Sequence, residues 1–265
     1  MLGKAVAIAF LALCVAGARA EPASPPVAGR TSAARLLAGA RQADGTWLAG
    51  VEIELSPHVV TYWRAPGEAG VPPSFDFSGS ANLQSAEPLY PAPKHIEEAG
   101  SLVAGYDAKV VFPLLVTPKD GAAPVRLDLT LNYAACDKIC LPARAHLALT
   151  LTPGETSPYA AEIARVAEAL VPKRLSAAEA RALFDVADAG EKGAWRLEYR
   201  GKGRLLDLFA EGPDPWFLEA SRAGDGFKLT LYSAAGSRAA PKEPIDAVLT
   251  LITDQGSFEA PVALR

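Results

Sequence analysis

Apolar and polar residues alternate with a period of two along several stretches in the first part of the chain. The longest is 125–133, in which each odd-numbered residue is Val, Leu or Tyr and each even-numbered residue is Arg, Asp, Thr or Asn. Such alternation is typical of strands with one buried face. Further strands are predicted at 51–55, 59–63, 110–116 and 147–151. Because turns rich in Pro and Gly separate these runs, we predict a mainly β protein in which residues 45–153 form an immunoglobulin-like β-sandwich.

The period changes after this region. Apolar residues recur at helical spacing between Pro158 and Leu170, and Pro is favoured in the first turn of a helix. Ser176 and Glu179 have the spacing of a capping box, which predicts a second helix. We therefore expect a short helical connector over residues 154–190.

Alternation resumes in the last part of the chain. The predicted strands are 195–199, 205–210, 216–220, 227–231, 245–252 and 258–264. They predict a second, smaller β domain over residues 191–265. This region contains no cysteine, no histidine and no recognisable set of catalytic residues. We expect it to act as a scaffold or to dock a partner.

The first twenty residues have the pattern of a secretory signal peptide. Lys4 is followed by an apolar run too short to span a bilayer, and Ala18-Arg19-Ala20 fits a cleavage site. A lipoprotein signal at Cys14 is disfavoured because the preceding Leu13 is large. Residues 1–20 thus predict an exported, periplasmic protein that does not span the membrane after cleavage and retains two cysteines.

Residues 21–44 are rich in Ala, Pro, Ser and Gly and lack strand alternation. The composition predicts a flexible lead, in which only residues 32–42 could order locally as a short helical turn.

Charge and motifs exclude several classes of function. The chain has 26 basic and 30 acidic residues, a net charge of −4, and no basic cluster, so nucleic acid is not expected as a partner. The Gly-x-Ser-x-Gly and His-Glu-x-x-His motifs of hydrolases are absent. No motif predicts a bound cofactor.

The candidate chemistry lies in Cys136 and Cys140, in a predicted connection of roughly ten residues between two antiparallel strands. A disulfide closing so short a loop contributes only about 2 kcal/mol, and a chain of this length needs no staple. These considerations favour a redox-active pair. A structural disulfide and a metal site remain as alternatives, the latter with ligands drawn from His58, His95 and His146.

Several separated motifs carry a resemblance to a known family. They are Thr61–Pro73, Tyr90–Pro93, Gly105-Tyr106, Asn132-Tyr133, Cys136-x-x-x-Cys140 and Pro142. Together they resemble the N-terminal periplasmic domain of the DsbD and ScsB thiol-disulfide interchange proteins, over about Trp47 to Pro153. The resemblance implies an immunoglobulin-like fold whose cysteine pair passes two electrons between periplasmic partners.

The resemblance also implies partners and roles. In full-length members a membrane conduit and a thioredoxin-like domain follow this domain, and this sequence shows neither. We therefore expect a separate membrane electron donor and a thioredoxin-like periplasmic oxidoreductase as partners. By resemblance Cys140 forms the intermolecular bond and Cys136 resolves it, although the sequence alone does not decide this order. The stretch from Trp63 to Pro73 is expected to cap the cysteines, and the aromatic residues Tyr62, Trp63, Tyr106 and Tyr133 are expected in the core.

Overall fold

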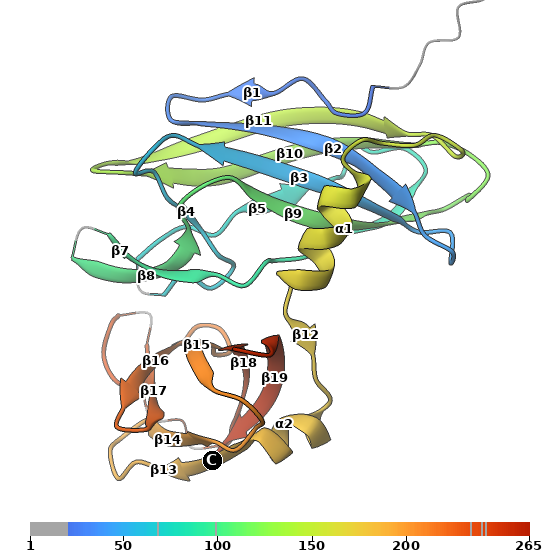
Figure 1. The fold of residues 1–265 in the computed structure, drawn as a ribbon. Coiled ribbons are helices and arrows are strands. Elements are labelled where there is room, and N and C mark those ends of the chain that lie inside the picture. The colour runs from blue at the N-terminus through green and yellow to red at the C-terminus, as the bar shows by residue number, and fades with distance from the viewer. Residues whose placement is uncertain (1–20, 68, 99, 234, 240, 242) are drawn as a thin grey trace, which may run out of the picture.

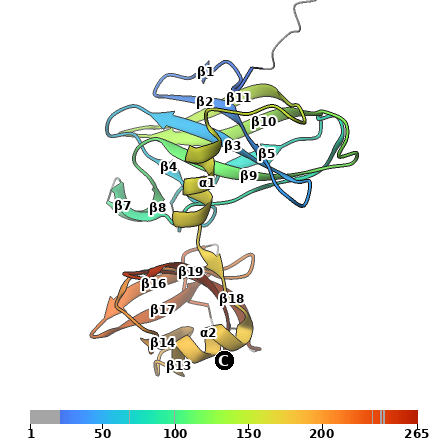
Figure 2. The same ribbon diagram turned by 45° about the vertical axis from the view of Figure 1, so that its right-hand side comes forward.

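The computed structural model describes residues 21–265 except 68, 99, 234, 240 and 242. The predicted signal peptide, residues 1–20, lies outside the described residues. Two β bodies are joined by a helix and a short strand (Figures 1 and 2). We call them the first sandwich, residues 21–151, and the second sandwich, residues 173–264. No helix in the described part of the chain is both long and apolar enough to cross a membrane.

The first sandwich packs a five-stranded sheet against a three-stranded one. The larger sheet has the order β1 (Val27–Ala28), β2 (Ser32–Arg41), β3 (Trp47–Leu55), β9 (Val110–Pro118) and β6 (Leu83–Pro88). The smaller sheet has the order β11 (Cys140–Leu151), β10 (Val125–Cys136) and β5 (Ser74–Asp76). The odd-numbered residues 125–133 of β10 are buried, as their alternation predicted. They meet apolar side chains of β3 and β9 in one core.

A third, small sheet extends from one end of the first sandwich (Figure 1). Its order is β4 (Thr61–Tyr62), β8 (Ser101–Tyr106) and β7 (Lys94–Glu98). Gly105 is required in β8 because a Cβ atom there would lie 2.3 Å from the carbonyl oxygen of Thr61. This close approach brings β4 alongside the hairpin of β7 and β8.

The predicted flexible lead is wrong, because Val27–Ala28 forms β1 and pairs with β2, and residues 32–41 form β2 and pair with β3. Leu36 faces the sandwich core and the adjacent Leu37 faces a different apolar cluster, and both are fully buried. The register shifts between Leu37 and Ala40, where a Cβ atom at Gly39 would lie 1.5 Å from the Leu48 carbonyl oxygen. A strand that buries both faces, is rich in Ala and contains a bulge shows no period of two.

The connector follows the predicted helices closely. Helix α1 (Ala160–Ala169) packs Ile163 and Val166 on the first sandwich, against Leu37 and Val111. Helix α2 (Ala177–Leu183) begins with the predicted capping box of Ser176 and Glu179. Between the helices, β12 (Lys173–Arg174) pairs in parallel with the last strand of the chain.

The second sandwich consists of two four-stranded sheets around one apolar core. Besides β12, their strands are β13 (Phe184–Asp188), β14 (Ala194–Tyr199), β15 (Leu205–Glu211), β16 (Phe217–Ala223), β17 (Gly226–Tyr232), β18 (Ile245–Thr253) and β19 (Gly256–Leu264). The orders are β12-β19-β18-β15 and β13-β14-β17-β16. The strands predicted from alternation are therefore present, with β13 in addition.

The two sandwiches share an interface built around Phe209 of β15. Its ring packs edge-on to Trp63, with centroids 5.8 Å apart, and stacks on His95 of β7 at 4.2 Å. Nδ1 of His95 also lies 3.0 Å from a carboxylate oxygen of Asp207. Phe209 is 3% exposed and belongs to the core of the first sandwich, although it comes from the second.

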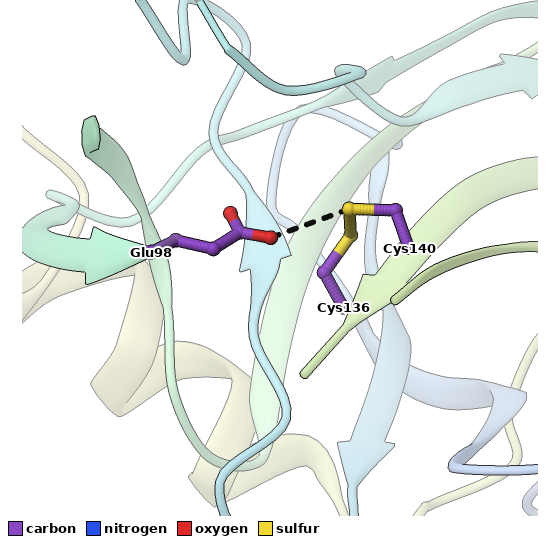
Figure 3. A group of neighbouring side chains, drawn as sticks. All are labelled: Glu98, Cys136 and Cys140. Carbon is purple, nitrogen blue, oxygen red and sulfur yellow. Dashed lines mark hydrogen bonds between the residues drawn. A yellow bond between two sulfur atoms is a disulfide. The ribbon is translucent and has the colours of Figure 1, made fainter. Parts of the chain in front are cut away.

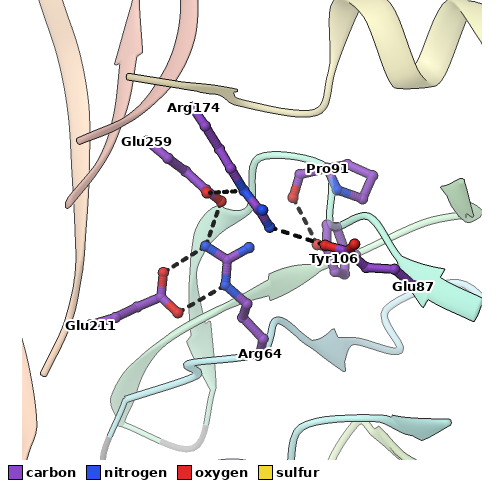
Figure 4. Close-up of polar contacts among 7 residues, drawn as sticks. All are labelled: Arg64, Glu87, Pro91, Tyr106, Arg174, Glu211 and Glu259. Carbon is purple, nitrogen blue, oxygen red and sulfur yellow. Dashed lines mark hydrogen bonds and ion pairs between the residues drawn. The ribbon is translucent and has the colours of Figure 1, made fainter. Parts of the chain in front are cut away.

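A charged cluster lies beside this aromatic contact (Figure 4). Arg64 donates hydrogen bonds of 2.8 and 2.6 Å to Glu211 and of 2.6 Å to Glu259. Arg174 lies between Glu259 and Glu87, at 3.4 and 3.2 Å. Burial alone would lower the pKa of Arg64, but its hydrogen bonds and charge interactions with Glu211 and Glu259 raise it, so the guanidinium stays charged.

Candidate functional site

The two cysteines close the hairpin of β10 and β11. The strands pair over twelve residues, and the last pair is Cys136 opposite Cys140. The two residues form a disulfide, with Cα atoms 4.0 Å apart (Figure 3). The predicted ten-residue connection is thus wrong, since only residues 137–139 form the turn. Pro142 argued against a strand at this position in the sequence. It is tolerated there because β11 is an edge strand.

The two cysteines differ in their exposure to solvent. Cys136 is fully buried, and its backbone exchanges hydrogen bonds of 2.9 and 2.8 Å with Val60. Cys140 is exposed, and Ile139 beside it is 73% exposed. A thiolate from a partner can therefore reach Cys140, whereas Cys136 is held inside the fold.

Tyr62 places its hydroxyl group against the disulfide. The hydroxyl oxygen lies 2.9 Å from Sγ of Cys136 and 3.3 Å from Sγ of Cys140, and it donates to Oε2 of Glu98 at 2.7 Å. Burial raises the pKa of Tyr62, and the hydrogen bond and charge of Glu98 raise it further. The hydroxyl therefore keeps its proton at neutral pH and remains a hydrogen-bond donor beside the sulfur atoms.

Glu98 is the third group at the site (Figure 3). It is the last residue of β7, and its Oε1 atom lies 3.3 Å from Sγ of Cys140. The turn after it contains Gly100 at a φ of 87°, a conformation that favours glycine. The small sheet of β4, β7 and β8 thus brings one tyrosine and one carboxylate to the cysteine pair.

Local contacts explain why Tyr62 faces the sulfur atoms. The hydroxyl group of Thr61 donates to the carbonyl oxygen of Ala134 at 2.8 Å, which ties β4 to β10. Tyr62 pairs with Gly105 of β8 and is buried. Tyr62 shares a small apolar cluster with Val60, Val103, Ala134 and Cys136. The tie to β10 and this cluster direct the tyrosine ring toward the end of the hairpin.

The expected cap is only partly supported. Trp63 is buried against Phe209 between the sandwiches and so does not cover the cysteines. Ala69 does pack against the apolar cluster of Cys136. Tyr106 and Tyr133 are buried in the core, as expected. Sequence reasoning missed Glu98, because it lies about forty residues before the cysteines in a stretch without a motif.

The expected histidine ligands do not gather at the cysteines. His95 pairs with Asp207 at 3.0 Å, and His146 lies 3.4 Å from Asp128 on the outer surface of β10 and β11. His58 lies in the turn before β4. Within the described residues, the thiol and carboxylate groups that could share one ion are those of Cys136, Cys140 and Glu98, whose ligand atoms lie within 4.8 Å of one another.

Comparisons with known proteins identify a similar family and a similar fold. Residues 32–152 match the family model of the N-terminal domain of the thiol:disulfide interchange protein DsbD. The structure is similar to the crystal structure of the N-terminal periplasmic domain of ScsB from Proteus mirabilis, with a TM-score of 0.69 and 20% identity. That match covers 92% of this chain and 98% of the other, so the fold likeness extends over both sandwiches. No curated protein sequence matches the chain. The predicted immunoglobulin-like fold is confirmed.

Proposed function

Starting from the fact that residues 32–152 form a domain of the DsbD N-terminal family, we propose that the chain is a thiol-disulfide exchange protein. Its Cys136–Cys140 pair carries two electrons from a membrane donor to a thioredoxin-like oxidoreductase. The observation that carries the proposal is the asymmetry of the disulfide, in which an exposed cysteine is bonded to a buried one.

The asymmetry supports a defined order of bond changes. A donor thiolate attacks Cys140, forms a mixed disulfide with it and releases Cys136 as a thiolate. A second donor thiol then attacks the mixed disulfide, so the donor becomes oxidised and both cysteines become reduced. In the return step the Cys140 thiolate attacks the disulfide of the acceptor, and Cys136 resolves the mixed disulfide. Two electrons pass in each half of the cycle.

Tyr62 and Glu98 support different parts of this reaction. The Tyr62 hydroxyl lies 2.9 Å from Sγ of Cys136, so its single proton can turn from Glu98 to the thiolate that leaves during the first attack. The Glu98 carboxylate lies next to Cys140, where its negative charge opposes a thiolate. The site therefore places a hydrogen-bond donor beside the buried cysteine and a carboxylate beside the exposed one.

Location and partners follow from the same premise. The structural relative is a periplasmic domain, and we assign this chain to the periplasm as well. Ile139 extends into solvent between the two cysteines and offers an apolar contact to an approaching partner. A thioredoxin-like partner presents its reactive cysteine on an exposed surface, and this suits a site whose attacked sulfur lies at a hairpin tip.

An equilibrium redox titration tests the proposal. The mature chain is equilibrated with glutathione or dithiothreitol buffers, and free thiols are counted by alkylation and mass. We expect a midpoint in the range of periplasmic exchange proteins, above about −300 mV. A bond that resists reduction until the fold is lost would overturn the proposal and leave an adaptor with a structural disulfide.

A further inference from the structure

We propose that the reduced site binds one Zn²⁺ ion through Cys136, Cys140 and Glu98. The ligand atoms of these three residues lie within 4.8 Å of one another before any ion is bound. Thiolate and carboxylate groups are both ligands of Zn²⁺, with Zn–S near 2.3 Å and Zn–O near 2.1 Å. The inference goes beyond electron transfer, and it rests on that proposal only in requiring that the disulfide can be reduced.

The position of Glu98 carries the geometric argument. Around a tetrahedral ion, a sulfur and an oxygen ligand lie roughly 3.6 Å apart, and two sulfurs roughly 3.8 Å apart. Oε1 of Glu98 is 3.3 Å from Sγ of Cys140, which is close to the first separation. After reduction the two sulfur atoms are no longer bonded and move apart, toward the separation of roughly 3.8 Å expected between two sulfur ligands.

The surroundings of the ligands also suit an ion. The Tyr62 hydroxyl donates to Glu98 at 2.7 Å and holds the carboxylate in place, as outer partners of metal ligands commonly do. Cys136 is buried, so one side of the site is closed to water, whereas the exposed Cys140 leaves a path of entry. Three protein ligands leave a fourth position for water.

The oxidation state of the pair would control binding. In the disulfide the sulfurs bear no negative charge and are poor ligands. Two electrons and two protons from a dithiol donor convert the pair to thiols, and Zn²⁺ then displaces both thiol protons. Bound Zn²⁺ in turn holds the sulfurs as ligands, so the ion competes with a partner disulfide for the same electron pairs. The carboxylate ligand favours Zn²⁺ over a softer monovalent ion such as Cu(I).

Adjacent glutamates provide a matched pair of variants. Glu97 precedes Glu98 in β7 but is exposed and lies outside the group of ligand atoms. Glu98→Gln and Glu97→Gln therefore remove the same charge from neighbouring positions. Only the first removes a proposed ligand.

The experiment measures Zn²⁺ affinity of the full mature chain under nitrogen, by competition with a chromogenic chelator. A phosphine reductant opens the disulfide and is then removed by gel filtration. We expect one Zn²⁺ per reduced chain and binding at least about 100-fold weaker for the oxidised chain. Glu98→Gln should weaken binding about 10- to 100-fold, whereas Glu97→Gln should leave it unchanged. With Co²⁺ as the probe, a thiolate charge-transfer band should appear in the reduced chain.

Other outcomes would overturn the site. Equal affinity of the two glutamine variants would exclude Glu98 as a ligand, and one ion per two chains would indicate bridging by Cys140 alone. Equal binding by oxidised and reduced chains would place the ion elsewhere. If the phosphine leaves the folded disulfide intact, the exchange proposal fails, and the chain is instead reduced in denaturant and refolded before the same titration. The two proposals can therefore fail separately.

Discussion

The last two strands of each sandwich form a long hairpin, and these two hairpins differ mainly at their tips. β10 and β11 pair over twelve residues and end in a disulfide at an exposed turn. β18 and β19 pair over nine residues and end at Thr253 opposite Gly256, where the threonine hydroxyl donates to the Gly256 carbonyl oxygen at 2.8 Å. The first tip is exposed over residues 137–140, and the second tip faces the first sandwich, where Ile252 packs against its core.

The difference shows that the fold supplies a hairpin but not a reaction. The tip of β10 and β11 becomes a chemical site because β4 and β7 add Tyr62 and Glu98 beside the sulfurs. No comparable side sheet accompanies β18 and β19 in the described part of the second sandwich. That sandwich instead contacts β7 through Phe209 and Asp207, which both touch His95. His95 lies three residues before Glu98 in the same strand. The second sandwich thus supports the strand that carries the carboxylate.

The largest expected effect comes from the cysteines themselves. Cys140→Ser removes the exposed sulfur and should reduce exchange to the uncatalysed rate. Cys136→Ser should instead accumulate a mixed disulfide through Cys140, because the resolving thiol is missing. Non-reducing electrophoresis with an oxidised thioredoxin-like partner measures both. Accumulation of the complex in Cys140→Ser alone would reverse the two roles. Either variant should lower the free energy of unfolding by about 2 kcal/mol.

A second prediction concerns the aromatic contact between the sandwiches. Phe209→Ala should leave a cavity beneath Trp63 and His95 and lower the free energy of unfolding by about 3 to 5 kcal/mol. Phe217→Ala is the control, because that ring is half-buried and stacks on Tyr232 within the second sandwich. Urea titrations followed by tryptophan fluorescence give both values. Equal losses of unfolding free energy in the two variants would argue against a special role for the interface.

The charged cluster at the interface should contribute less. Arg64→Met removes the cation between Glu211 and Glu259, which are both mostly buried. We expect a loss of about 2 kcal/mol, which decreases in high salt. Arg200→Ala removes an exposed ion pair with Asp185 and should change stability by less than about 0.5 kcal/mol. If Arg64→Met behaved like Arg200→Ala, the cluster would not stabilise the interface.

Glu98→Gln should change reactivity more than stability. Removing the carboxylate beside Cys140 relieves repulsion of the thiolate, so the reduced chain should be alkylated about 3- to 10-fold faster at neutral pH. The Glu97→Gln variant again serves as the control. Rates measured with iodoacetamide in the absence of metal test the expectation. A slower or unchanged rate in Glu98→Gln would exclude this electrostatic role.

The smallest expected effect is the dependence of stability on alkaline pH. Burial raises the pKa of Tyr62, of Tyr90 to about 12, of Tyr106 and of Tyr133. Above about pH 10 the unfolded chain loses these protons while the folded chain keeps them, so stability should fall as the pH rises.

Tyr62→Phe removes one of these groups and should make the fall less steep. Urea unfolding midpoints measured between about pH 8 and 11 give the slope of stability against pH for each protein. An identical slope for both proteins would show that Tyr62 ionises alike in the folded and unfolded states.

Much of the fold is determined by local sequence. The strict alternation of residues 125–133 predicted β10, since only a strand gives a period of two. The capping box at Ser176 predicted the start of α2, because cap and helix are a few residues apart. The cysteine spacing likewise identified the pair, and the motifs around it predicted the resemblance to the family whose model matches residues 32–152. In each case the interacting groups are neighbours along the chain.

The tertiary structure alone decided which of these groups meet. β2 was missed because its residues bury both faces, and this is visible only when α1 covers the outer one. The different exposure of Cys136 and Cys140 depends on the distant Val60, and the carboxylate beside Cys140 comes from β7. Phe209 completes the core of a sandwich to which it does not belong in sequence. Periodicity records which side of its own strand a residue occupies, whereas the site depends on strands that pair across long stretches of chain.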